Sequence, residues 1–276
     1  MNFTTLRFAS PGMPSTTKGG TIEGVAENAR IGLHAMELEF VHSVNISKDK
    51  TVLVKEAMTK HDVTLTCHAP YYINLNAIEK KKLEASKQRL LNAALVADAC
   101  GAWSITFHPA YYLGMPPDTV HSNTRKALAE IQEELKQNGA TIRLSPETTG
   151  KPSQYGDINE LLTLSHELGI APCIDFSHLH ARSNGKWNTT EEFKTILSTV
   201  EEKLGKNALK QLHCHISGIA YSAKGEQHHL NLEESDMKYE ELLNVCKDFK
   251  VAGTIVSESP NREEDAFLLK RLWEKR

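Results

Sequence analysis

The sequence lacks the features of a disulfide-stabilised, membrane-spanning or strongly basic protein. Its 276 residues include five cysteines, none of them in a CxxC pair: Cys67, Cys100, Cys173, Cys214 and Cys246. This odd and scattered set argues against a disulfide framework and for a reducing compartment. No apolar run approaches the roughly 20 residues that cross a bilayer, and the first residues, MNFTTLRFASPG, lack the basic and apolar regions of a signal peptide. We therefore expect a soluble, cytoplasmic protein.

The charge balance excludes a uniformly basic surface. Lys and Arg number 32 and Asp and Glu number 35, which gives a formal net charge of -3. Any contact with nucleic acid must therefore come from a local patch rather than from the field of the whole molecule. No linker, low-complexity tract or short repeat divides the chain, so we expect one domain over residues 1–276.

Short apolar runs alternate with longer amphipathic stretches along the chain. Eight runs have the length and composition of strands: Leu6–Ser10, Ala35–Val41, Thr64–Pro70, Ser104–Ala110, Thr141–Glu147, Ala171–Phe176, Gln211–Ile216 and Gly253–Ser257. Helical stretches between them include Lys80–Cys100, Thr119–Asn138, Ile158–Leu168, Thr189–Leu204 and Tyr239–Phe249. This alternation predicts an α/β fold, and a closed (β/α)₈ TIM barrel more readily than an open sheet.

Six of these runs end in a potential metal ligand just before a turn. The segments CHAP, FHP, SPET, IDFSH, HCHISG and SESP carry His68, His108, Glu147, Asp175 with His178, His213 with His215, and Glu258. A buried strand would normally continue with Val, Ile or Leu, because an unpaired buried polar group costs about 1–3 kcal/mol. Strand ends converge at the C-terminal mouth of such a barrel, where the reaction site lies. The sequence therefore predicts one metal-binding pocket built from six strand ends.

The donor types favour zinc or manganese over magnesium. Imidazole and carboxylate suit zinc, and a pair of ions about 3.5–4 Å apart can promote a phosphoryl displacement. The segment GEQHHLN, residues 225–231, lies in the expected loop after the seventh predicted strand and adds Glu226 and His228. Because these two are two residues apart, they would share one side of an extended segment. Together with His178 they supply enough donors for a third ion.

The ordered segments HAPYYINL, FHP, ETTG, IDFSH, HISG, GEQHH and ESP resemble the endonuclease IV family of abasic-site endonucleases. The resemblance runs from His68 to Glu258 at barrel-like spacing. It implies a monomeric base-excision-repair enzyme with about three zinc ions, one or more replaceable by manganese. Such an enzyme hydrolyses double-stranded DNA 5′ to an abasic site and leaves a 3′-hydroxyl.

The resemblance also implies a role for each matching residue. It assigns His68, His108 and Glu147 to a first ion, Glu147, Asp175, His215 and Glu258 to a second, and His178, Glu226 and His228 to a third. Glu147 and Glu258 are the expected catalytic residues. Tyr71 corresponds to the tyrosine that enters the abasic gap, Tyr72 follows it, and we expect Arg182 in the loop HARSNGKW to grip phosphates. Bacterial members present a basic DNA-probing residue in the loop after the second strand, and this chain has Glu37, Leu38, Glu39 and Phe40, then Val41 and His42, in that region.

Two questions stay open at this stage. Alternation lets both His213 and His215 face the barrel interior, so spacing does not choose the ligand, although the HISG segment favours His215. A sugar isomerase or epimerase of the xylose-isomerase-like class is the alternative function, since Glu147, Asp175, His215 and Glu258 would hold its single ion. The same alternation points Cys67 and Cys214 away from the mouth and places Cys173 one layer below Asp175.

Overall fold

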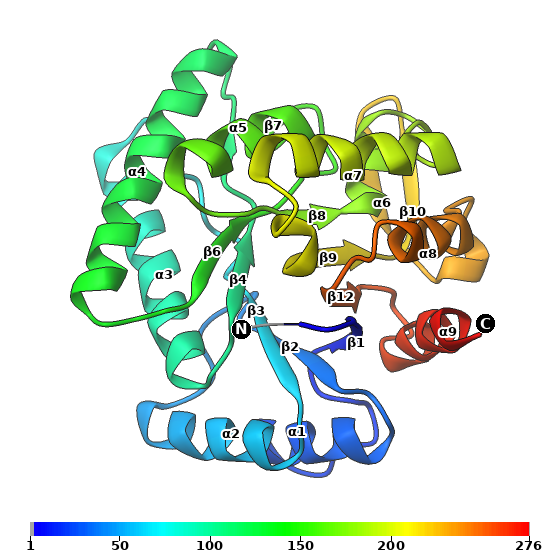
Figure 1. The fold of residues 1–276 in the computed structure, drawn as a ribbon. Coiled ribbons are helices and arrows are strands. Elements are labelled where there is room, and N and C mark those ends of the chain that lie inside the picture. The colour runs from blue at the N-terminus through cyan, green and yellow to red at the C-terminus, as the bar shows by residue number, and fades with distance from the viewer. Residues whose placement is uncertain (1–2, 276) are drawn as a thin grey trace.

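The computed structural model, which describes residues 3–275, confirms the predicted TIM barrel (Figure 1). Eight parallel strands lie in the order β6, β4, β3, β2, β1, β12, β9, β8. Their bounds are β1 Leu6–Pro11, β2 Ala35–Glu39, β3 Thr64–His68, β4 Ser104–Phe107, β6 Arg143–Pro146, β8 Cys173–Asp175, β9 Leu212–Ile216 and β12 Gly253–Ser257. The two ends of this order meet at a parallel bridge between Glu147 and Cys173, which joins β6 to β8 and closes the sheet.

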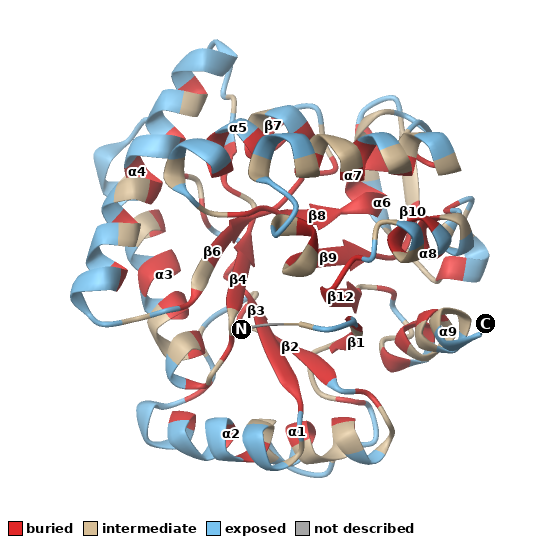
Figure 2. Ribbon diagram, in the orientation of Figure 1, coloured by how far each residue is buried: buried red, intermediate tan, exposed pale blue. Residues whose placement is uncertain are grey.

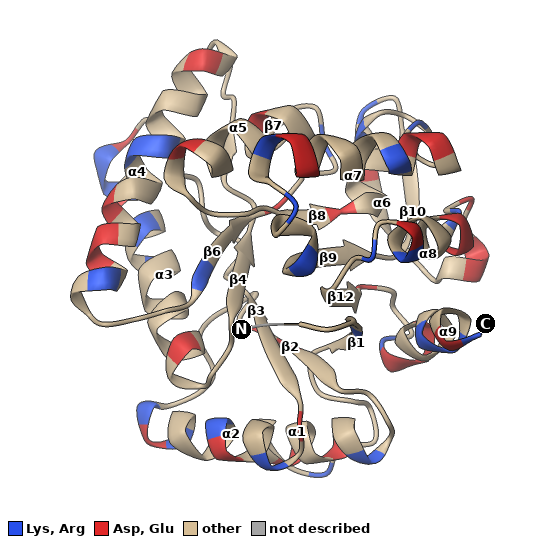
Figure 3. Cartoon of the chain, in the orientation of Figure 1, with Lys and Arg blue, Asp and Glu red and all other residues tan. Residues whose placement is uncertain are grey.

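The helices form the outer layer of the barrel. Figure 2 shows buried strands inside helices whose outward faces are exposed. Their bounds are α1 Thr21–Arg30, α2 Lys48–Lys60, α3 Lys80–Ala99, α4 Pro117–Gln137, α5 Ile158–Leu168, α6 Phe176–Arg182, α7 Thr190–Leu204, α8 Tyr239–Asp248 and α9 Glu263–Glu274. Side-chain capping boxes begin α5 and α7, with Asp157 before the first and Thr189 before the second. Acidic and basic residues are interspersed along the outer helices (Figure 3).

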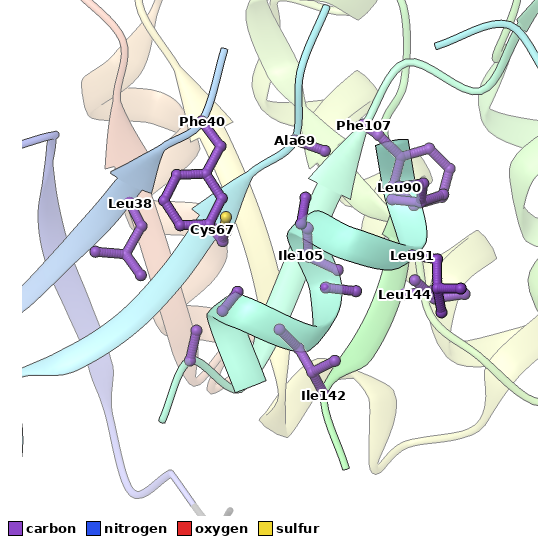
Figure 4. Packing of buried hydrophobic residues seen from close by; sticks show 14 of the residues in the cluster. Leu38, Phe40, Cys67, Ala69, Leu90, Leu91, Ile105, Phe107, Ile142 and Leu144 are labelled. Carbon is purple, nitrogen blue, oxygen red and sulfur yellow. The ribbon is translucent and has the colours of Figure 1, made fainter. Parts of the chain in front are cut away.

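Apolar side chains fill the space between the strands and the helices rather than the barrel axis. Leu90 and Leu91 of α3 belong to one buried cluster with Ile105 of β4 and Leu144 of β6 (Figure 4). Cys67 lies in the same cluster and Cys214 in a second one, so both point away from the barrel interior as alternation predicts. Buried polar residues such as Glu37, His213 and His215 occupy much of the barrel interior instead, so the axis can hold a functional site.

Several elements were not predicted from sequence. A short pair, β5 (Ala110–Tyr111) and β7 (Gln154–Tyr155), lies beside the mouth. The segment expected as a loop after the seventh strand is an antiparallel hairpin of β10 (Gly218–Ser222) and β11 (Gly225–Leu230). Helix α6 begins directly after β8, because the Asp175 side chain accepts a hydrogen bond from the His178 amide. No helix within residues 3–275 has the length and apolar character needed to cross a bilayer.

Candidate metal centre

The strand ends bring the predicted ligands together at the C-terminal mouth. His68 and Asp175 are the last residues of β3 and β8, and Glu147 and Glu258 directly follow β6 and β12. In the register of the sheet, Asp175 pairs with His215. The segments that are far apart in the sequence therefore end close together at the mouth of one barrel, as this fold requires.

Glu147 lies at the middle of this centre and is fully buried. Its Oε1 lies 3.2 Å from Nδ1 of His178, 3.5 Å from Nε2 of His108 and 3.6 Å from Nδ1 of His215. Its Oε2 lies 3.4 Å from Nε2 of His68 and accepts a 3.1 Å hydrogen bond from the Thr106 hydroxyl. One carboxylate thus contacts four imidazoles from four segments, which is the position of a bridging ligand.

Among the described residues, potential donor atoms lie within 4.8 Å of one another in four groups, of which one is Cys173, His213 and His215. The three at the mouth are His68, His108 and Glu147; Glu147, Asp175, His215 and Glu258; and His178, Glu226 and His229. Glu147 belongs to the first two. Nitrogen and oxygen donors in threes and fours are typical of zinc sites that keep an open coordination position.

Buried atoms without partners indicate that these groups fit metal ions. Among the described residues, Glu147 Oε1, Asp175 Oδ2 and His215 Nδ1 are buried and make no hydrogen bond. Leaving one such atom unsatisfied costs about 1–3 kcal/mol, and all three belong to the same donor group. A divalent cation bound there would satisfy all three atoms together.

The remaining nitrogen of each of three histidines is held by a backbone carbonyl. Nδ1 lies 2.7 Å from the Ala69 oxygen in His68, 3.0 Å from the Thr148 oxygen in His178, and 3.1 Å from the Glu258 oxygen in His229. A proton on Nδ1 donates to the carbonyl and leaves the Nε2 lone pair for a metal. Such contacts fix the tautomer and the ring orientation of metal-binding histidines.

Charges within the centre compensate one another. Burial alone would raise the pKa of the two glutamates, but the imidazoles, His215 first, hold the pKa of Glu147 well below its usual range and that of Glu258 at about 2. Burial dominates for Asp175 and raises its pKa to about 6, although His178 opposes this. For His68, burial lowers the pKa, but contacts with Glu147 raise it to about 10. The low pKa values of the two glutamates and the high pKa of His68 have one cause, the attraction between imidazole and carboxylate groups.

The structure corrects the expected third group, which contains His229 rather than His228. A β-bulge lies in the hairpin: Tyr221 pairs with Glu226 and Ala220 pairs with His228, so Gln227 is an extra residue. The extra residue shifts the alternation by one. His229 therefore lies with Glu226 and His178, whereas His228 is exposed.

The geometry separates His215 from His213. Only His215 belongs with Glu147, Asp175 and Glu258, and its Nδ1 lies 3.3 Å from the Glu258 carboxylate. His213 lies deeper, where Nδ1 contacts the Ser104 hydroxyl and Nε2 contacts Glu37. Cys173 is near both histidines, but burial raises the pKa of its thiol to about 12, which disfavours the thiolate needed for a metal ligand.

The residues expected to contact DNA have different surroundings. Tyr71 and Tyr72 are 55% and 66% exposed, and the Tyr71 ring lies edge-on to His68 at 5.4 Å. Both are therefore free at the rim of the centre. Nη1 of Arg182 donates to the Thr149 hydroxyl and to the Lys151 and Gln154 carbonyls. These contacts tie the guanidinium to the segment from β6 to β7, and its contact with phosphates stays a prediction.

Two interior carboxylates were noticed in the sequence only as a departure from the family pattern. Glu37 is fully buried and contacts both His213 and His215. Glu39 pairs in register with His68, and burial, with Glu37 adding to it, raises the pKa of Glu39 to about 8. Acidic residues at alternate positions of an otherwise apolar strand were the signal, since such residues share one face.

Comparisons with known proteins agree on the barrel fold, but the similar proteins include both endonucleases and epimerase-like proteins. A family model described as xylose isomerase-like TIM barrel matches residues 25–274. The chain is 41% identical over 268 residues to an uncharacterized protein of Methanocaldococcus jannaschii, with 97% of each covered. It is 24% identical over 185 residues to a probable endonuclease 4 of Aquifex aeolicus, covering 66% of this chain and 64% of that protein.

Two solved structures with this barrel have names that indicate different chemistry. Endonuclease IV from Thermus thermophilus has a TM-score of 0.74 at 19% identity, with 99% of this chain and 100% of that one covered. A D-tagatose 3-epimerase-like protein has a TM-score of 0.73 at 15% identity, with 98% and 96% covered. Both likenesses concern the fold, so the chemistry has to be argued from the site.

Proposed function

Since the chain belongs to the xylose isomerase-like TIM barrel family, we propose that it is a zinc-dependent endonuclease that hydrolyses double-stranded DNA 5′ to an abasic site. The observation that carries this proposal is the number of converging donors. A sugar epimerase needs a single ion, whereas here three donor groups meet around Glu147. The similarity to proteins named endonuclease 4 supports the same choice.

In this proposal each donor group holds one ion, with manganese able to replace zinc at one or more positions. His68, His108 and Glu147 hold the first, Glu147, Asp175, His215 and Glu258 the second, and His178, Glu226 and His229 the third. The ions supply Lewis acidity for attack on the phosphodiester and for the charge on the leaving oxygen. The carboxylates of Glu147 and Glu258 would hold the ions in place, and backbone carbonyls orient three of the imidazoles.

The exposed rim of the centre is the proposed DNA contact. Tyr71 lies against His68 with more than half of its surface free, so it can fill the gap left by a missing base, and Tyr72 follows it on the same loop. Stacking of a base on an aromatic ring contributes about 1–3 kcal/mol. Lys224 lies at the tip of the hairpin, and the neighbouring Gly225 packs against Lys151. Lys224 is exposed and Lys151 is half-buried, and both are proposed as further phosphate contacts beside Arg182.

The direct test is incision of a labelled duplex that carries one abasic analogue resistant to β-elimination. We expect one nick 5′ to the lesion with an extendable 3′-hydroxyl, lost after prolonged chelation and restored by zinc or manganese. An undamaged duplex of the same sequence is the control. No nick from folded protein loaded with either metal would contradict the proposal.

Two observations favour a sugar isomerase or epimerase as the second candidate. Glu147, Asp175, His215 and Glu258 alone suffice for one ion, and a solved epimerase-like protein shares the barrel. The salt dependence of ligand binding discriminates, because binding to DNA phosphates weakens steeply as salt rises. Uncharged sugars bind with little salt dependence, so epimerisation of a ketose without DNA binding would select this candidate.

A further inference from the structure

Glu37 lies beneath the metal centre, between two histidines of β9. Its Oε1 is 3.0 Å from Nε2 of His215 and its Oε2 is 3.0 Å from Nε2 of His213, and all three side chains are fully buried. Both pairs lie within ion-pair distance, although neither has the N–H angle of a hydrogen bond. A proton on each Nε2 would be attracted to the buried carboxylate, whereas a lone pair there would be repelled by it.

This contact reverses the usual tautomer at one ligand. His68, His178 and His229 direct Nδ1 to a backbone carbonyl, which leaves Nε2 for a metal. His215 does the opposite, since Nε2 is held by Glu37 and Nδ1 faces Glu147 and Glu258. His215 thus differs from the other three in that this nitrogen faces a carboxylate and no backbone carbonyl, whereas Nδ1 of His178 contacts the Thr148 carbonyl as well as two carboxylates.

We propose that Glu37 is the positioning residue of the second ion: it fixes His215 as the Nε2-protonated tautomer and raises the basicity of Nδ1 toward the metal. Carboxylate–histidine–metal arrangements have this effect. The residue acts through His215 and does not touch the ion. The inference rests on the proposed role of His215 as a ligand, and is independent of the substrate.

A chain of polar contacts anchors Glu37 from the opposite side. Nδ1 of His213 lies 3.0 Å from the Ser104 hydroxyl, which lies 2.8 Å from the Ser145 hydroxyl. Nε of Arg143 donates to Ser145 at 3.1 Å. If His213 carries its proton on Nε2, then Ser104 donates to His213 and Ser145 donates to Ser104, so the donors run in one direction from Arg143 to Nδ1 of His213, whose Nε2 lies 3.0 Å from Glu37.

The chain also supplies charge for a carboxylate that is buried deep in the barrel. Among the residues that the structure describes, Arg143 has no carboxylate within ion-pair distance, and its guanidinium lies 4.5 Å above the Trp103 ring. The contacts from Arg143 through two serines and His213 thus connect this cation to the Glu37 anion. A barrel axis filled with Val, Ile and Leu would offer neither this connection nor a fixed tautomer.

Nitrogen NMR of the zinc-loaded protein with ¹⁵N-labelled histidine tests the inference without any substitution. We expect His215 to show a zinc-bound Nδ1 and a protonated Nε2, and His68, His178 and His229 to show the reverse. His215 bound through Nε2, or sharing the tautomer of the other three, would overturn the proposal. The spectrum is recorded without substrate, so it decides this point whether or not the protein incises DNA.

Glu37→Gln tests the energetic consequence. The amide has one acceptor oxygen for two N–H donors, so one histidine must lose its partner, and we expect the second ion to be released at about 10–100-fold lower chelator concentration than in the wild type. Glu39→Gln, the same change two residues along β2, is the matched control and should retain zinc as the wild type does. Equal retention in both variants, measured by zinc analysis, would overturn the proposal. If Glu37→Gln does not fold, the NMR result on the wild type decides.

Discussion

At the scale of single residues, Glu258 contributes a carboxylate to the second donor group without sharing it with the first. Its Oε1 lies 3.3 Å from Nδ1 of His215. Glu258→Gln replaces a charged ligand by a neutral one of the same shape, so we expect the incision rate to fall by about 100-fold or more. Loss of a residue that only hydrogen-bonds a metal ligand already lowers activity by about 10–100-fold. Steady-state incision assays measure this, with thermal unfolding to establish that the fold is kept. Unchanged turnover would remove Glu258 from the site.

Tyr71 provides a second test at this scale. It is exposed at the rim and makes an edge-on contact with His68. In Tyr71→Ala we expect binding to abasic duplex to weaken by about 1–3 kcal/mol, the contribution of one stacked ring, and binding to intact duplex to change less. Fluorescence anisotropy with the two duplexes measures both. An equal loss on both would mean that Tyr71 does not enter the gap.

The residues that the sequence identified best are those at the ends of strands. Strand alternation and barrel geometry together predicted that His68, Glu147 and Asp175 would meet, and the structure brings them together. The contacts of Arg182 could not be predicted from the sequence in this way, because its guanidinium donates to acceptors of Thr149, Lys151 and Gln154. Those acceptors include two backbone carbonyls, whose positions depend on tertiary structure and leave no mark in the side-chain pattern.

At the scale of elements, the hairpin β10–β11 shows why one expected ligand was wrong. Alternation along an uninterrupted strand places Glu226 and His228 on one side, but the bulge at Gln227 substitutes His229. The strand was expected as a loop, so no register was available to reveal the bulge. By contrast, β12 and α5 have the predicted bounds, because turn signals and a capping box mark their ends locally.

The neighbouring histidines of this hairpin form a matched pair for a test. We expect His229→Ala to lose the third zinc ion, because it removes one of three donors, and His228→Ala to keep it, because His228 is exposed. Zinc analysis after dialysis against a weak chelator measures the number of ions per chain. Loss of zinc from the His228 variant alone would contradict the assignment of His229 and would make His228 the ligand, as an uninterrupted strand predicts.

At the scale of the whole molecule, the barrel axis carries carboxylates and imidazoles in place of an apolar core. Glu37, Glu147, Asp175 and Glu258 approach one another along the axis, where an ordinary barrel packs branched apolar side chains. The imidazoles compensate part of the negative charge of these carboxylates. The confirmed barrel fold therefore does not by itself explain the interior, since apolar packing is replaced there by groups that hold cations.

Metal removal should accordingly lower the stability of the entire protein. An ion that binds only the folded state adds about 2.7 kcal/mol to the free energy of unfolding at a concentration 100 times its dissociation constant. We expect chelation to lower the melting temperature, and the difference between loaded and stripped protein to shrink as pH falls. The sign follows from proton competition: burial raises the pKa of Asp175 to about 6, Glu147 raises the pKa of His68 to about 10, and each group must lose its proton before it binds an ion. Calorimetry of both forms between pH 5 and 8 measures the difference, and a gap that stayed constant or widened toward pH 5 would show that the buried carboxylates do not bind the metal.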